Sequence, residues 1–98
     1  MAKTEIRTEH APTPAAAFSQ GVRKGNIVQV AGQVGVDPAT GKVVGTTVAE
    51  QARQTLGNIV AVLAAAGASM DDVVMLRVYL TDTAHFGELN AAYNEFVT

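Results

Sequence analysis

Apolar positions alternate within residues 27–31, whereas within residues 48–63 they recur at steps of three and four residues. Short apolar runs broken by Gly and Pro predict strands over residues 4–8, 18–23 and 27–34. The turn Lys24-Gly25-Asn26 contains a glycine that can take a positive φ, so the last two strands are predicted to form a hairpin. The two prolines within residues 11–14 predict a loop after the first strand, because proline lacks the donor that a strand needs.

The middle of the chain predicts a long amphipathic helix. Thr47 and Glu50 match the S/T-x-x-E capping box, in which each side chain accepts from a backbone amide of the first turn. The helix is expected to run to about Ala66, with Gly67 just beyond its end. Its polar residues, Asn58 among them, are expected to point away from an apolar stripe that covers a sheet. The stripe consists of Val48, Ala52, Leu56, Ile59, Val60 and Leu63.

A further strand and a second helix are predicted in the last third. Branched residues dominate Val73–Thr81, which predicts a strand reached through a short capped turn at residues 69–72. Asp82 or Thr83 can cap a helix with Phe86 and Tyr93 on its apolar side. The order β-β-β-α-β-α predicts one α+β domain over residues 1–98, a mixed sheet with two helices packed on one face.

Composition narrows the function classes. The chain has 98 residues, no Cys and a net charge of −2, so disulfides and thiol chemistry are excluded and nucleic acid is an unexpected partner. The longest near-apolar run, residues 59–68, is about half of what a membrane span needs, and the N-terminus lacks an apolar signal core. A cytoplasmic protein with no membrane contact is therefore expected.

The sequence contains no complete motif for a metal site, a serine nucleophile or a phosphate-binding loop. His85 and Glu88 supply two metal ligands on one predicted helix where three or four are usual, so no metal site is expected. Ser19 and Ser69 lie in no nucleophile elbow. Gly32 and Gly35 give only G-x-x-G, too little for a phosphate cradle. Asp37-Pro38-Ala39-Thr40-Gly41, by contrast, has the residues of a tight turn.

Two polar residues, Asn90 and Arg77, could each have either a structural role or a role in ligand binding. Asn90 flanks the apolar side of the second helix, either as a boundary residue bonded to a helix carbonyl or as a specific polar contact. Arg77 lies midway along the predicted strand 73–81, where it could pair with a carboxylate ligand or with an acidic neighbour.

A series of short motifs resembles the RidA family, also called YjgF/YER057c/UK114. The likeness runs from about Thr13 to the end of the sequence. It rests on Phe18-Ser19-Gln20, Ala31-Gly32-Gln33, Asp37–Gly41, Gln51-Ala52-Arg53-Gln54, Ala64–Gly67, Asp71–Val74, Leu80-Thr81-Asp82 and Phe86 with Asn90, Tyr93 and Phe96.

This resemblance implies a chorismate-mutase-like fold assembled as a homotrimer, with ligand pockets in the clefts between subunits. It also implies a deaminase without cofactor that hydrolyses reactive enamines and imines, such as 2-aminoacrylate formed by pyridoxal-phosphate enzymes, to 2-keto acids and ammonia. Two alternatives stay open: a non-catalytic trimeric module that binds a small metabolite, and an endoribonuclease or translation inhibitor, which the net charge disfavours.

The resemblance assigns substrate-binding positions to Phe18, Ala31, Gly32, Gln33 and Asn90. Phe18 stands where the family has Tyr and Ala31 where it has Ser, so two hydroxyl groups are lost. Gly32, Gln33 and Asn90 match the family, and the glycine allows a ligand to approach the backbone closely.

The family's final strands have no counterpart in this sequence. Relatives continue into a P-A-R-x-x-V element and two more strands, and the Arg of that element clamps the substrate carboxylate, so no catalytic residue can be assigned here. Two explanations are open: a piece of a longer protein, which we favour, or a short form whose sheet edge another chain covers.

Overall fold

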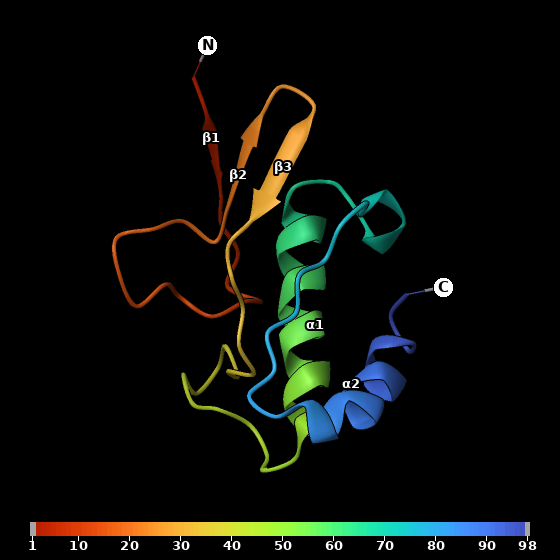
Figure 1. Cartoon of the computed structure of the whole chain (residues 1–98). Coiled ribbons are helices and arrows are strands. Elements are labelled where there is room, and N and C mark those ends of the chain that lie inside the picture. Colours follow the sequence, from red (N-terminus) through yellow and green to blue (C-terminus); the bar gives the residue numbers. More distant parts are fainter. Residues whose placement is uncertain (1, 98) are drawn as a thin grey trace.

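A three-stranded antiparallel sheet and two α-helices form the fold of the computed structural model, which describes residues 2–97 (Figure 1). Strands β1 (Thr4–Ile6), β2 (Gly21–Lys24) and β3 (Ile27–Val30) lie in the order β1-β2-β3. Helix α1 (Val48–Ala65) packs against the sheet, and α2 (Phe86–Tyr93) packs on α1. Short 3-10 turns η1 (Met70–Asp72) and η2 (Thr83–His85) connect the later elements.

The predicted hairpin is confirmed, with shorter strands than expected. Lys24 pairs with Ile27 across a two-residue loop in which Gly25 has a φ of +59°. The predicted strand 18–23 begins only at Gly21, because the amide of Phe18 donates to Ala16 in a tight turn, 2.8 Å. The predicted strand 27–34 ends at Val30, because the chain folds back at Val36, whose amide donates to Val34, 2.7 Å.

Both predicted ends of α1 are confirmed. The Thr47 hydroxyl accepts from the Glu50 amide at 3.1 Å and donates to the Glu50 carboxylate at 2.8 Å. At the other end Gly67 has a φ of +79°, and the Ala68 amide donates to Leu63 at 2.8 Å. This pattern of bonds is the Schellman motif, which satisfies carbonyl groups that the helix leaves unpaired.

The face of α1 that meets the sheet differs from the predicted one. Val62, fully buried, forms the core with Ile6 and Ala11, and the strand residues Val28 and Val30 pack against it. Asn58 lies one turn before Val62 on the same face and is 1% exposed, so the prediction that it points away was wrong. Periodicity identified an apolar stripe, yet it could not show which flank of that stripe the sheet would cover.

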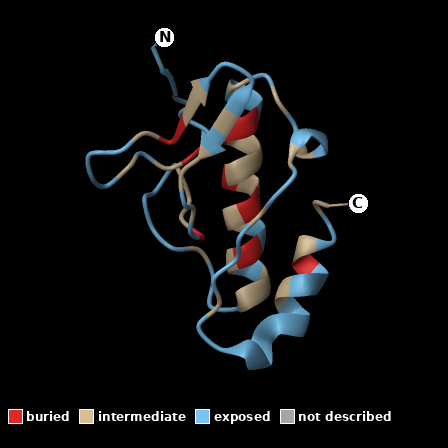
Figure 2. Ribbon diagram, turned by 45° about the horizontal axis from the view of Figure 1, so that its top comes forward, coloured by how far each residue is buried: buried red, intermediate tan, exposed pale blue. Residues whose placement is uncertain are grey.

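The predicted strand Val73–Thr81 is wrong for this structure. The segment runs extended beside α1, and no other strand lies next to it within residues 2–97 (Figure 1). The sheet is therefore antiparallel rather than mixed, and the order of regular elements is β-β-β-α-α. Figure 2 shows the buried residues gathered along α1 and the strands, while this segment and most of α2 are exposed.

Candidate functional site

The loop after β3 brings together three of the predicted site residues, Ala31, Gly32 and Gln33. At its start the Ala31 amide donates to the Gln20 carbonyl at 2.9 Å, one step beyond the β2–β3 ladder. Phe18 lies two residues before Gln20, on the loop that leads into β2.

Gln20 fixes the chain beside that loop. It is 4% exposed, and its side-chain amide donates to the carbonyls of Thr8, Ala11 and Pro12 at 2.9, 3.1 and 2.9 Å. Its side-chain oxygen accepts from the Thr8 amide at 2.7 Å. The Gln20 side chain therefore joins residues 8–12 to β2, a role that the motif Phe18-Ser19-Gln20 alone did not reveal.

The far end of the loop is attached to α1. The Asn58 side-chain amide donates to the carbonyls of Val34 and Val36 at 3.2 and 2.9 Å. Gly35 is buried, and a Cβ there would lie 2.9 Å from the Gln51 carbonyl oxygen. The turn that follows is the predicted one, since the Gly41 amide donates to Asp37 at 2.8 Å.

Between these two attachments the loop is open to solvent. Gly32 is exposed, and a Cβ added to it would meet nothing within 4 Å. The side chain of Gln33 makes one long bond, 3.4 Å, to the Ala31 carbonyl. Within residues 2–97 the amides of Gly32, Gln33 and Val34 have no protein acceptor, so they can donate to a ligand.

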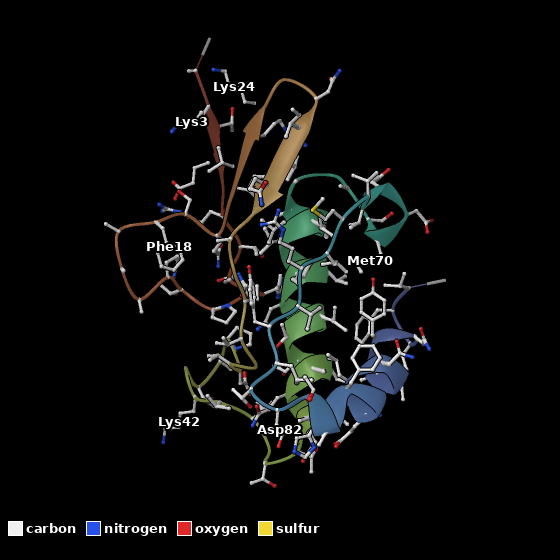
Figure 3. The ribbon with its side chains drawn as sticks, viewed as in Figure 1. Lys3, Phe18, Lys24, Lys42, Met70 and Asp82 are labelled. Atoms are coloured by element: carbon white, nitrogen blue, oxygen red, sulfur yellow. The ribbon has the colours of Figure 1, made fainter. Side chains whose placement is uncertain are left out.

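Phe18 and Asn90 lie on opposite sides of the molecule. Phe18 is 52% exposed on the loop before β2, where Figure 3 labels it. Asn90 is exposed on α2, which lies across α1 from the sheet (Figure 1). One copy of the chain therefore brings Ala31, Gly32 and Gln33 together and leaves Asn90 apart from them.

The remaining polar candidates are separate from this loop. Arg77 is exposed and has no ion-pair partner in the described part of the chain. The Nδ1 atom of His85 lies 3.8 Å from the Glu88 carboxylate, and residues 2–97 contain no group of three potential metal ligands.

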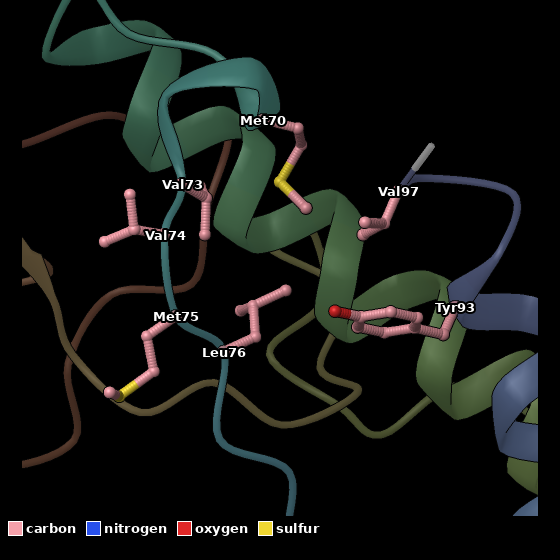
Figure 4. A pocket seen from close by; sticks show the side chains of 7 residues that line it. All are labelled: Met70, Val73, Val74, Met75, Leu76, Tyr93 and Val97. Atoms are coloured by element: carbon pink, nitrogen blue, oxygen red, sulfur yellow. The ribbon is translucent and has the colours of Figure 1, made fainter.

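A pocket of about 240 Å³ that the sequence did not predict lies between residues 70–76 and the end of α2, lined by apolar side chains and Tyr93. Figure 4 shows Met70, Leu76, Tyr93 and Val97 pointing toward its shared space, while Val74 and Met75 project on the other side of the segment. No charged side chain lines this pocket, so it offers no ionic partner to a carboxylate ligand. Two features of the sequence could have indicated this pocket: the alternation of side chains within residues 73–76 and the place of Tyr93 on the apolar side of the second helix.

Perturbed acids and bases lie around α1 rather than at the loop. The hydroxyl of Thr47, helped by the amides of Thr46 and Thr47, lowers the pKa of Glu50. Arg53 donates from Nε to one carboxylate oxygen of Glu95 and from Nη2 to the other, which lowers the pKa of Glu95 and raises the pKa of Arg53. Glu50 caps the start of α1, and the Arg53–Glu95 pair joins α1 to the turn after α2, so none of these groups belongs to the loop of Ala31 to Gln33. No helix in residues 2–97 is long and apolar enough to cross a membrane.

The fold and the loop define a small α+β domain that presents an anchored, glycine-containing loop beside its sheet. Residues 8–98 match the sequence model of the family described as Endoribonuclease L-PSP. The chain is 43% identical over 98 residues to the 2-iminobutanoate/2-iminopropanoate deaminase of Escherichia coli K12 and covers 75% of that protein. The chain belongs to this family, the RidA/YjgF/L-PSP family.

Solved structures agree with this assignment. RidA from the Antarctic bacterium Psychrobacter sp. PAMC 21119 matches with a TM-score of 0.93 and 38% identity, over 97% of this chain and 76% of that one. The Escherichia coli protein TdcF with bound serine matches with a TM-score of 0.91 and 36% identity, over 95% of this chain and 72% of that one. The RidA-like fold is thus confirmed, and the chain spans about three quarters of the length of these relatives.

Proposed function

We propose that this protein is an enamine/imine deaminase that hydrolyses 2-imino acids to 2-keto acids and ammonia. The observation that carries the proposal is the 43% identity, over all 98 residues, to a 2-iminobutanoate/2-iminopropanoate deaminase. In the reaction water adds to the imine carbon, the C–N bond breaks, and nitrogen leaves as ammonia while the oxygen stays as the keto group.

The loop after β3 can serve this chemistry through its backbone. The unpaired amides of Gly32, Gln33 and Val34 can donate to a substrate carboxylate, and the open space at Gly32 lets the substrate come close. The weakly bonded Gln33 amide can turn toward the substrate. Phe18 offers an apolar surface for the substrate's carbon chain. The catalytic work required is mainly to orient the imine toward water.

A homotrimer with ligand clefts between subunits belongs to the same proposal. Asn90 and the loop of Ala31 to Gln33 lie on opposite sides of α1, so only a neighbouring copy can bring an Asn90 to this loop. The expectations of a cytoplasmic protein with no cofactor and no nucleic-acid partner also stay predictions.

The test is ammonia release from a 2-imino acid produced in the assay by a pyridoxal-phosphate enzyme acting on serine or threonine. We expect release faster than in buffer, and we expect Gln33→Ala to slow it. Gln29→Ala is the matched control, because Gln29 is exposed on β3 and lies outside the proposed site. Ammonia release no faster than in buffer, for short and longer imino acids alike, would exclude the deaminase.

A non-catalytic binding protein is the second candidate. Phe18 and Ala31 carry no hydroxyl group to position water, and TdcF has been solved with bound serine. Calorimetric binding of serine or of a 2-keto acid, without turnover of the imine, would favour this candidate. The endoribonuclease alternative is the weakest of the three, because a net charge of −2 gives a phosphate backbone little attraction.

A further inference from the structure

Asn58 is a polar residue in an otherwise apolar contact between α1 and the sheet. It is 1% exposed and lies one helical turn from Val62, the fully buried centre of the core. A buried amide must be hydrogen-bonded, because an unpaired donor that is removed from water loses its hydrogen bonds to water without any replacement. A leucine of similar size would pack at this position without that requirement.

Every hydrogen-bonding group of the Asn58 side chain is used. Its nitrogen donates to the carbonyls of Val34 and Val36, and its oxygen accepts from the Gln54 side chain at 2.8 Å. The two donors therefore join α1 to the loop after β3 at positions two residues apart. They flank Gly35, which has no room for a side chain against Gln51.

The start of the loop is attached independently, by the bond from Ala31 to Gln20. Only Gly32, Gln33 and the amide of Val34 lie between the Ala31 amide and the Val34 carbonyl, and the Val34 side chain is 64% exposed. Three consecutive peptides with unpaired amides would be flexible on their own. With both ends fixed, their amides keep one direction, which is the requirement for binding an anionic group without reorganisation.

We propose that Asn58 is a positioning residue, which acts through the backbone of Gly32, Gln33 and Val34 to orient their amides toward the substrate. The effect of Asn58 on substrate binding rests on the proposed function. Its effect on the order of the loop does not, and can be measured separately. It assigns to the site a residue from the buried face of α1 that never touches the substrate.

The experiment compares Asn58→Leu with the wild-type chain. Nuclear relaxation gives the order parameters of the amides from Gly32 to Gly35, and a titration with 2-oxobutanoate, the stable keto product, gives the affinity. We expect the order parameters to fall from about 0.85 to below about 0.6. We expect the affinity for 2-oxobutanoate to fall about tenfold, the equivalent of one lost hydrogen bond.

Two controls separate positioning from general stability. Leu63→Ala removes a buried side chain from the same helix and should lower stability without changing the loop amides. Gln54→Ala removes only the bond to the Asn58 oxygen, so both donors to the loop stay in place. If Asn58→Leu does not fold, Asn58→Ala removes the same two donors to Val34 and Val36 with a smaller, uncharged side chain.

The outcomes are distinct. Loop amides that stay as ordered in the Asn58 variants as in the wild type would overturn the inference, as would disordered amides with unchanged affinity for 2-oxobutanoate. A wild-type chain with neither binding nor turnover would contradict the proposed function instead. In that case the order parameters would still show whether Asn58 orders the loop.

Discussion

Gly35 and Gly32 differ in surroundings although they lie three residues apart in one loop. A Cβ at Gly35 would lie 2.9 Å from the backbone oxygen of Gln51, whereas a Cβ at Gly32 would meet nothing within 4 Å. We expect Gly35→Ala to lower the free energy of unfolding by about 1–3 kcal/mol, because the backbone of α1 cannot move aside cheaply. Urea denaturation measures this change.

Gly32→Ala is the matched control. It should leave the urea midpoint almost unchanged and, if the proposed function is right, weaken binding of 2-oxobutanoate because the methyl group occupies the ligand's approach. Equal midpoints for the two variants would show that the contact between the loop and α1 is looser than the structure indicates.

The side chain of Gln20 makes the densest set of polar contacts around the sheet. We expect Gln20→Ala to lower the free energy of unfolding by about 2–3 kcal/mol, since it leaves buried carbonyls and the Thr8 amide without partners. Denaturation gives the size of the effect, and limited proteolysis should cut residues 8–12 first. Gln29→Ala, at an exposed position of β3, should change neither result.

The capping box at the N-terminal end of α1 should make the stability of the fold depend on pH. Hydrogen bonds from Thr47 and from the amides of Thr46 and Thr47 lower the pKa of Glu50 below its ordinary value of 4.5 in the folded state. The unfolded chain therefore binds a proton at Glu50 more readily than the folded chain does. The stabilisation is complete above the ordinary carboxyl pKa and is lost as the pH falls through the lower folded value.

We expect Glu50→Gln to weaken the dependence of the thermal midpoint on pH below about 4.5. The measurement is a series of melting curves from neutral to acid pH. Glu9→Gln is the control, because Glu9 is exposed and the hydrogen bonds to glutamate side chains within residues 2–97 involve Glu5, Glu50, Glu88 and Glu95 instead. If the thermal midpoints of the wild type and Glu50→Gln fall equally with decreasing pH, the capping box contributes nothing to the loss of stability in acid.

Features held by hydrogen bonds between residues close in the sequence could be predicted from the sequence. Features that depend on residues far away in the sequence could not. The capping box at Thr47, the turn at Gly25 and the helix end at Gly67 all formed as predicted, because their bonds join residues close in the chain. Asn58 was misplaced because its partners lie more than twenty residues away. The predicted strand 73–81 failed because a strand needs a neighbour that its own sequence does not supply.

At the scale of the whole molecule, four exposed large apolar side chains, Val74, Met75, Val78 and Tyr79, lie along the segment Val73–Thr81. Val74 is 101% exposed, Tyr79 is 87% exposed and Met75 is 69% exposed. An extended segment with free backbone groups and apolar side chains pairs readily with another chain. The proposed homotrimer would need such a surface, because an exposed row of apolar side chains on one extended segment can be buried against another copy of the chain.

We expect the 98-residue chain to associate with itself and Tyr79→Lys to weaken that association, because a charged side chain at the centre of a strand-like contact must lose its water. Sedimentation velocity over the accessible concentration range measures the species present. Val43→Lys is the matched control, since Val43 is 59% exposed on a loop outside this segment. A wild-type chain that sediments as a monomer at every concentration, or a Val43 variant that dissociates as readily as the Tyr79 variant, would contradict the assignment of this surface.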